Sequence, residues 1–296
     1  MATQNKVTRT YFQYFLALLL FGFNGIVASY IHLNSYEIVL LRTLIGSVFL
    51  AVIFFSTKGR WHGIKNKKHL VYLIVSGSAM GTSWMFLYEA YSEVGVSVAT
   101  LAYYCGPIIV ILLSPLLFRE RFTVHKIGGF LFVLLGMYLV NGTALQQSGF
   151  SWGLLCGILS AVMYAVMVIF NKKASSIEGL ENSMLQLFFS FLTVLVFVQI
   201  KQGLVIPTLF DNIVPILVLG IVNTGVGCYL YFSAIQKLPA GSVAICGYLE
   251  PLSALVFSAI FLQERLAMIQ IVGAVLIICG AAYGELSAFR SKKTAL

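Results

Sequence analysis

The feature that most constrains this chain is a series of apolar runs, most close to the roughly 20 residues that cross a bilayer as a helix. Backbone N–H and C=O groups find no water in lipid, so such a run spans the membrane as a helix. Most connections between the runs are short, which makes sequence neighbours antiparallel and leaves no room for a soluble domain. The ten predicted spans are residues 11–31, 36–56, 70–91, 96–118, 123–140, 149–170, 182–200, 213–235, 241–262 and 267–286.

Composition supports the same class. Hydrophobic residues make up 59% of the 296 residues, charged residues 10%, and the mean hydropathy is +0.94. A soluble domain carries about 25% charged residues, so an all-α integral membrane protein is predicted. The first run follows Lys6 and Arg9 and exceeds the roughly 7 to 15 residues of a signal-peptide core, so it is interpreted as an uncleaved span.

An internal repeat relates two parts of the chain. The pattern of residues 94–138 recurs within residues 238–283 when the numbering is shifted by 144, and each copy has a proline within an apolar run, a Glu-Arg pair and glycines seven residues apart. The matched pairs are Tyr104/Tyr248, Pro107/Pro251, Ser114/Ser258, Glu120/Glu264, Arg121/Arg265, Ile127/Ile271, Gly129/Gly273 and Gly136/Gly280. The pattern indicates a duplicated membrane hairpin.

The second copy, LPAGSVAICGYLEPLSALVFSAIFLQERLAMIQIVGAVLIICG, resembles the closing signature of EamA-type carriers of the drug/metabolite transporter superfamily. The resemblance covers nearly the whole chain and is strongest in the two hairpins. It implies a carrier fold in which the first, third, fourth, sixth, eighth and ninth helices line a cavity. It also implies that amino acids or related metabolites are common cargo.

Lysine and arginine positions predict the orientation of the chain. With ten spans and a cytoplasmic N-terminus, sixteen of the 19 basic residues fall on the cytoplasmic side, two fall outside, and Arg42 lies within a span. The outside pair is Lys201 and Arg265. Both termini are therefore predicted in the cytoplasm of a multi-pass inner (plasma) membrane protein.

Five spans in each half force the two halves to insert in opposite senses. The predicted units are two inverted five-helix repeats, residues 1–141 and 149–287, followed by a short basic cytoplasmic tail, 288–296. Inverted repeats place a binding site near the bilayer midplane and permit alternating access by rocking.

Three ionisable residues within spans are candidates for substrate or ion binding, because a buried charge needs a partner or water. They are Arg42, Glu89 and Glu250. The hypothesis is that Arg42 binds a substrate carboxylate or balances a buried acid, while Glu89 or Glu250 binds a cation or a coupling proton. The alternative is structural: an ion pair or helix-end brace for Arg42 and Glu250, and a solvated rim position for Glu89.

Further candidates are polar and aromatic residues near the predicted midplane, on spans that line the cavity in EamA-like folds: Asn24, Trp84, Tyr103, Tyr104, Tyr164, Asn223 and Tyr248. Pro107 and Pro251 each free a backbone carbonyl one turn earlier, and kinks there would help to open a pocket. The alternative for each tyrosine is a hydrogen bond to a neighbouring helix.

Other functional classes lack their motifs. The sequence has no P-loop, no H-E-x-x-H and no recognisable catalytic set, so ATP-driven transport and enzymatic activity are not expected. No cofactor or metal is predicted, and the basic residues form no groove for nucleic acid. We expect a secondary transporter that exports a small polar metabolite, with that substrate, a coupling proton and the lipid bilayer as partners. An importer of a metabolite or nucleoside-type compound is the first alternative, ahead of a membrane enzyme or sensor.

Overall fold

The computed structural model describes residues 2–57, 59, 61–62, 65–120, 123–145, 151–203, 213–261, 263 and 267–293. Within these residues all regular structure is helical. The elements are α1 (Ala2–Gly22), α2 (Asn24–Ala28), α3 (Ser35–Ser56), α4 (Lys67–Tyr103), α5 (Cys105–Phe118), α6 (Val124–Leu145), α7 (Trp152–Lys173), α8 (Gly179–Gln202), α9 (Ile213–Leu217), η2 (Val218–Val226), α10 (Gly227–Ile235), α11 (Ala240–Gly247), α12 (Leu249–Phe261) and α13 (Met268–Lys293).

Eight helical segments of the described chain are long and apolar enough to cross a membrane. They are Val7–Ala28, Ser35–Ser56, Lys67–Gly95, Val98–Phe118, Trp152–Lys173, Gly179–Gln202, Ile213–Ile235 and Ala240–Phe261. Two shorter apolar helices, Val124–Val140 and Met268–Gly284, occupy the positions of the fifth and tenth predicted spans. The chain is thus an all-helical, multi-pass membrane protein, and the count of ten spans stays a prediction.

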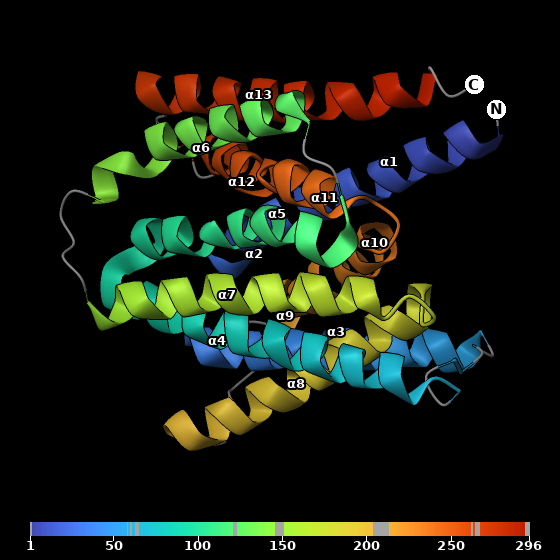
Figure 1. Cartoon of the computed structure of the whole chain (residues 1–296). Helices are drawn as coiled ribbons and strands as arrows, with labels where there is room; N and C mark the ends of the chain where they lie inside the picture. The colour runs from blue at the N-terminus through green and yellow to red at the C-terminus, as the bar shows by residue number, and fades with distance from the viewer. Residues whose placement is uncertain are drawn as a thin grey trace.

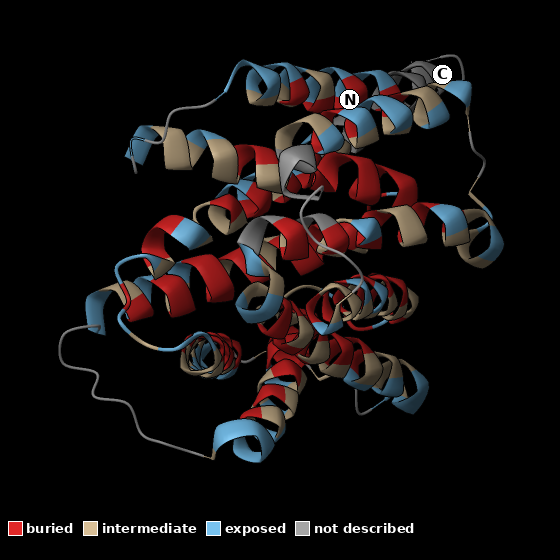
Figure 2. Ribbon diagram, turned by 90° about the vertical axis from the view of Figure 1, so that its left-hand side faces the viewer, coloured by how far each residue is buried: buried red, intermediate tan, exposed pale blue. Residues whose placement is uncertain are grey.

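The helices lie side by side in one bundle, and α1 begins at the end of the bundle where α13 finishes (Figure 1). Buried residues gather where helices face one another, and exposed residues lie on outward surfaces and at helix ends (Figure 2). Many outward side chains are large and apolar, for example Leu116 at 79% exposure and Val196 at 59%. Such a surface suits lipid rather than water.

Three spans are interrupted by short breaks. The first breaks at Phe23, the fourth at Tyr104 and the ninth at Tyr248. The last two are repeat-matched, and each precedes its proline by three residues, so both helices are interrupted within one turn of Pro107 and Pro251. The predicted Arg121 and Glu264–Arg265 turns lie outside the described residues, as do the side chains of the tail 288–296.

Close packing of α6 against α13 depends on glycine. In the α6/α13 contact, a Cβ on Gly136 would lie 2.6 Å from the carbonyl oxygen of Gly273, and a Cβ on Gly273 would lie 2.6 Å from that of Gly136. Gly280 faces the Gly129 carbonyl oxygen at the same distance. The two backbones therefore touch, which is how small residues stabilise helix pairs in lipid.

Candidate functional site

Arg42 lies two turns into α3 and is 6% exposed. Its Nε donates to Thr224 Oγ1 at 2.9 Å, and its guanidinium carbon lies 4.9 Å from the centroid of the Trp84 ring. The ring covers one face of the guanidinium in a cation–π contact. Within the described part of the chain, the two terminal nitrogens have no hydrogen-bond partner. This free edge matches the planar, bidentate geometry of a carboxylate.

Glu250 lies in the first turn of α12, two residues after the break at Tyr248, and is half-buried. Its carboxylate forms no ion pair or hydrogen bond with any residue that the structure describes. It interacts electrostatically with Arg42 beyond ion-pair distance. The two charges therefore influence the same region of the bundle, and neither is directly neutralised there by a protein group.

The candidate tyrosines surround this region. The Tyr103 ring lies 5.4 Å from Tyr104 and 5.5 Å from Tyr164, and all three interact electrostatically with Glu250. Tyr248 is fully buried and donates its hydroxyl to the Tyr104 carbonyl at 2.7 Å, so it fastens one span break to the other. Tyr103, Tyr104 and Tyr164 are half-buried. These three retain accessible side-chain surface, whereas Tyr248 has none.

Asn24 and Asn223 meet at the break in the first span. Asn223 Nδ2 donates to Asn24 Oδ1 and to the Leu20 carbonyl, both at 3.0 Å. Asn223 thus bonds a carbonyl of the turn interrupted at Phe23, where lipid offers no hydrogen-bond donor. This contact gives both asparagines a structural role at one edge of the candidate site.

Glu89 lies apart from this arrangement in an ion pair. Its side chain is 10% exposed, its Oε1 lies 2.7 Å from Lys201 Nζ, and its Oε2 accepts a hydrogen bond from the Tyr36 hydroxyl. The group joins α3, α4 and α8. Glu89 is therefore buried and partnered, in contrast to the solvated rim position considered from the sequence.

Sequence reasoning missed several residues that the structure brings to the region. Thr224, 0% exposed, contacts Arg42, while Tyr231 bonds Tyr164 across hydroxyl oxygens 3.1 Å apart and packs against Tyr14 at 5.7 Å. In the sequence, these residues are marked only by a hydroxyl group within an apolar run. That signal is shared by many residues whose hydroxyls bond their own helix.

A buried polar cluster surrounds Gln186, which the repeat shift of 144 relates to Arg42. There Gln186 Nε2 donates to Ser76 Oγ at 2.8 Å, and its Oε1 accepts from Asn171 Nδ2 at 3.3 Å. Asn171 also donates to Asn182 at 3.0 Å, and all four residues are 0% exposed. The members of this cluster bond one another, so the cluster stabilises the packing of α4, α7 and α8.

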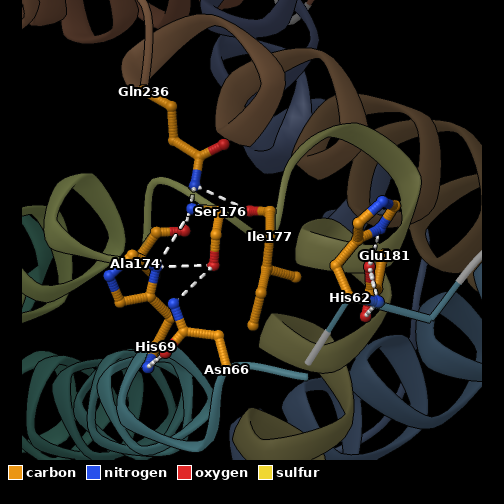
Figure 3. Close-up of polar contacts among 8 residues, drawn as sticks. All are labelled: His62, Asn66, His69, Ala174, Ser176, Ile177, Glu181 and Gln236. Carbon is orange, nitrogen blue, oxygen red and sulfur yellow. Dashed lines mark hydrogen bonds and ion pairs between the residues drawn. The ribbon is translucent and has the colours of Figure 1, made fainter. Parts of the chain in front are cut away.

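The turn between α7 and α8 is held by side chains from three other segments (Figure 3). Gln236 Nε2 donates to three carbonyls of the turn region, the shortest at 3.0 Å, and His69 Nδ1 lies 2.6 Å from Ser176 Oγ. His62 Nδ1 lies 3.0 Å from a carboxylate oxygen of Glu181. Both histidines lie at span ends in loop-fixing contacts.

The long apolar helices, the lipid-facing surface and the buried charges define a polytopic membrane protein. The EamA-like transporter family matches residues 8–142 and 151–283. The chain therefore belongs to the EamA-like transporter family.

Individual relatives agree with this class. The uncharacterized transporter YxxF of Bacillus subtilis (strain 168) is 25% identical over 281 residues, covering 90% of this chain and 86% of YxxF. The uncharacterized transporter YoaV of the same strain is 25% identical over 81% of this chain and 83% of YoaV. A solved crystal structure with 18% sequence identity superposes with a TM-score of 0.80 over 94% of this chain and 98% of that one, which supports the fold alone.

Proposed function

We propose that this transporter is a secondary carrier that exports a small zwitterionic metabolite, an amino acid or a related compound, across the inner membrane by alternating access. The substrate carboxylate binds the free edge of Arg42, and its amino group lies toward Glu250. Both termini are in the cytoplasm, and the two inverted repeats, 1–141 and 149–287, rock about the site. The observation that carries the proposal is the pair of unneutralised opposite charges in one buried region.

Matched features of the two halves support the inverted-repeat part of the proposal. α3 of the first half packs on η2 of the second, with Gly46 against Gly220, and α8 of the second half packs on α4 of the first through Gly77. Arg119 and Gln263, related by the shift of 144, both have left-handed backbones at helix ends, with φ of 55° and 57°. Reciprocal contacts of this kind are expected when a pseudo-two-fold axis relates the repeats.

Glu250 is the proposed site of the coupling proton, because its carboxylate alone among the candidate acids lacks a direct partner in the described chain. Glu89 is committed to Lys201 and Tyr36. A carboxylate without a fixed counter-ion can be neutralised either by a proton or by a substrate ammonium group. Competition between the two for Glu250 would couple substrate release to proton entry.

A binding screen tests the substrate class. Purified protein is heated with each of the twenty L-amino acids, and with matched amines and carboxylic acids that lack one of the two charges. A ligand that binds only the folded state stabilises it in proportion to the logarithm of concentration over Kd. We expect stabilisation by at least one amino acid and a weaker effect from its singly charged analogues. Equal stabilisation by the matched amine would contradict the role of Arg42.

Proteoliposomes test transport and coupling with the amino acid that stabilises most strongly. Arg42→Gln should abolish counterflow. Glu250→Gln should raise the half-saturating substrate concentration for counterflow, because it removes the partner of the amino group, and it should abolish transport driven by a pH gradient while counterflow at saturating substrate persists. Glu89→Gln is the matched control, since it removes another membrane carboxylate and should leave pH coupling intact. Unchanged pH dependence in Glu250→Gln would assign coupling elsewhere, and uptake into inside-out vesicles measures the export direction.

A further inference from the structure

The Thr224 hydroxyl makes two hydrogen bonds, one as donor and one as acceptor. Its Oγ1 donates to the Leu219 carbonyl, five residues earlier, at 2.8 Å and accepts from Arg42 Nε at 2.9 Å. A hydroxyl has one proton to donate, so the bond to Leu219 turns a lone pair toward the arginine. The residue is 0% exposed, which protects both bonds from water.

The backbone around Thr224 is a π-helix, η2, within the eighth predicted span. In this part of the chain the two halves align at a shift of 143, with the pairs Gly77/Gly220, Leu87/Leu230 and Tyr88/Tyr231. The matched segment of α4, residues 75–83, is a regular α-helix, so the repeat does not require the wider turn. π-Helical segments within α-helices are rare and occur frequently at functional sites. Here the segment meets α3 closely, because a Cβ on Gly46 would lie 3.0 Å from Thr224 Cγ2.

The contacts of Arg42 leave one edge of the guanidinium plane open to an anion. Thr224 occupies Nε, and the Trp84 ring covers one face of the guanidinium. The edge formed by the two terminal nitrogens has no partner among the described residues. An anion that binds in the guanidinium plane is therefore directed to that edge.

We propose that Thr224, presented by the π-helix η2, is the positioning residue of the substrate site: it fixes the plane of Arg42 so that the terminal-nitrogen edge is offered to a substrate carboxylate. The assignment rests on the proposed function, because Arg42 is the group that touches substrate. Thr224 itself makes no substrate contact and acts through the arginine.

A spectroscopic measurement tests the positioning without a known substrate. In protein labelled with 15N-arginine, the Arg42 Nε–H signal is assigned by its loss in Arg42→Gln. In wild type and Thr224→Ser the Arg42 Nε–H hydrogen should exchange slowly with solvent. In Thr224→Val this exchange should be at least about tenfold faster, because a hydrogen bond to a charged group is lost. Thr43→Val is the matched control, since Thr43 is a buried neighbour whose hydroxyl bonds only backbone carbonyls of its own helix. An unchanged signal in Thr224→Val would overturn the inference.

Counterflow of an equimolar mixture of the twenty 14C-labelled L-amino acids tests the consequence. Thr224→Val should raise the half-saturating concentration about tenfold with little change in the saturated rate, and Thr224→Ser should restore it. If Arg42→Gln transports like wild type, or wild type does not transport the mixture, the proposed function fails while the Nε–H signal still decides the positioning. If Arg42→Gln is inactive and Thr224→Val matches wild type, the positioning role is wrong.

Discussion

Replacing one glycine of the α6/α13 contact by alanine should destabilise the protein by an amount set by backbone contact. A Cβ on Gly280 would lie 2.6 Å from the Gly129 carbonyl oxygen and 2.9 Å from both Phe132 Cβ and Val133 N. Ordinary contact begins at 3.4 Å, so the helices must separate by about 0.8 Å, the difference between the two distances. None of the three atoms belongs to a side-chain end that can rotate away. Overpacking of this kind costs about 1–3 kcal/mol.

A matched variant separates this cost from helix propensity. Gly25 lies in α2 with nothing within 4 Å of the point where a Cβ would lie, so Gly25→Ala reports propensity alone, a gain of up to about 1 kcal/mol. At about 2–4 °C per kcal/mol, Gly280→Ala should melt about 2–12 °C below Gly25→Ala. The assay is apparent melting temperature in detergent, followed by tryptophan fluorescence at a fixed scan rate.

The reciprocal pair adds a second check of the same reasoning. Gly136 and Gly273 face each other, so one separation of the helices accommodates both new Cβ atoms. The double alanine variant should therefore cost less than the sum of the single variants, as neighbouring sites do when they share one displacement. Additive costs, or a Gly280→Ala variant as stable as Gly25→Ala, would refute the backbone-contact argument.

The remaining predictions concern the membrane topology, the Glu89–Lys201 ion pair and the cap of α11. A reporter fused after Ala144 should lie outside the cell, and a reporter fused after Lys172 should lie in the cytoplasm. If both reporters lie in the same compartment, the prediction of ten spans is wrong. Lys201→Met should lower the melting temperature, because it leaves the buried Glu89 carboxylate without its ion-pair partner. Glu89→Gln should cost less, because the Lys201 side chain is 46% exposed and water can solvate it. The double variant should therefore recover part of the loss seen in Lys201→Met. Full additivity of the two changes would argue against the pair. Glu120→Gln should destabilise the folded protein by about 0.5–1 kcal/mol, because the Glu120 carboxylate accepts hydrogen bonds from the first two N–H groups of α11. An unchanged melting temperature in this variant would contradict a stabilising role for the cap.

The location of the helices follows from local properties of the sequence. The predicted run 36–56 is the helix Ser35–Ser56, and the predicted run 241–262 is Ala240–Phe261, because length and apolarity alone decide which segments can span a membrane. The breaks near Pro107 and Pro251 were predictable for the same reason, since a missing N–H is a local property.

The partners of the polar residues were not predictable in this way. Glu89 and Lys201 are 112 positions apart, and Arg42 and Thr224 are 182 apart, so nothing in either local segment specifies the contact. The π-helix has no compositional signature either, because it differs from an α-helix only in the spacing of its backbone hydrogen bonds, i to i+5 in place of i to i+4. Sequence therefore identified Arg42, Glu89 and Glu250 as candidates, and only the structure separated the paired charge from the two unpaired ones.

The two halves differ at the positions of both unpaired candidate charges. The repeat relates Arg42 to Gln186, whose amide is saturated in a closed cluster, and Glu250 to Gly106, where a Cβ would lie 2.7 Å from the Tyr164 ring. At both positions the neutral residue satisfies the packing, so the architecture does not require a charge. One charge comes from each half, and a rocking motion of the halves would change the separation of Arg42 from Glu250. A carrier that binds a zwitterion between them would therefore alter its affinity as it changes the side to which it opens.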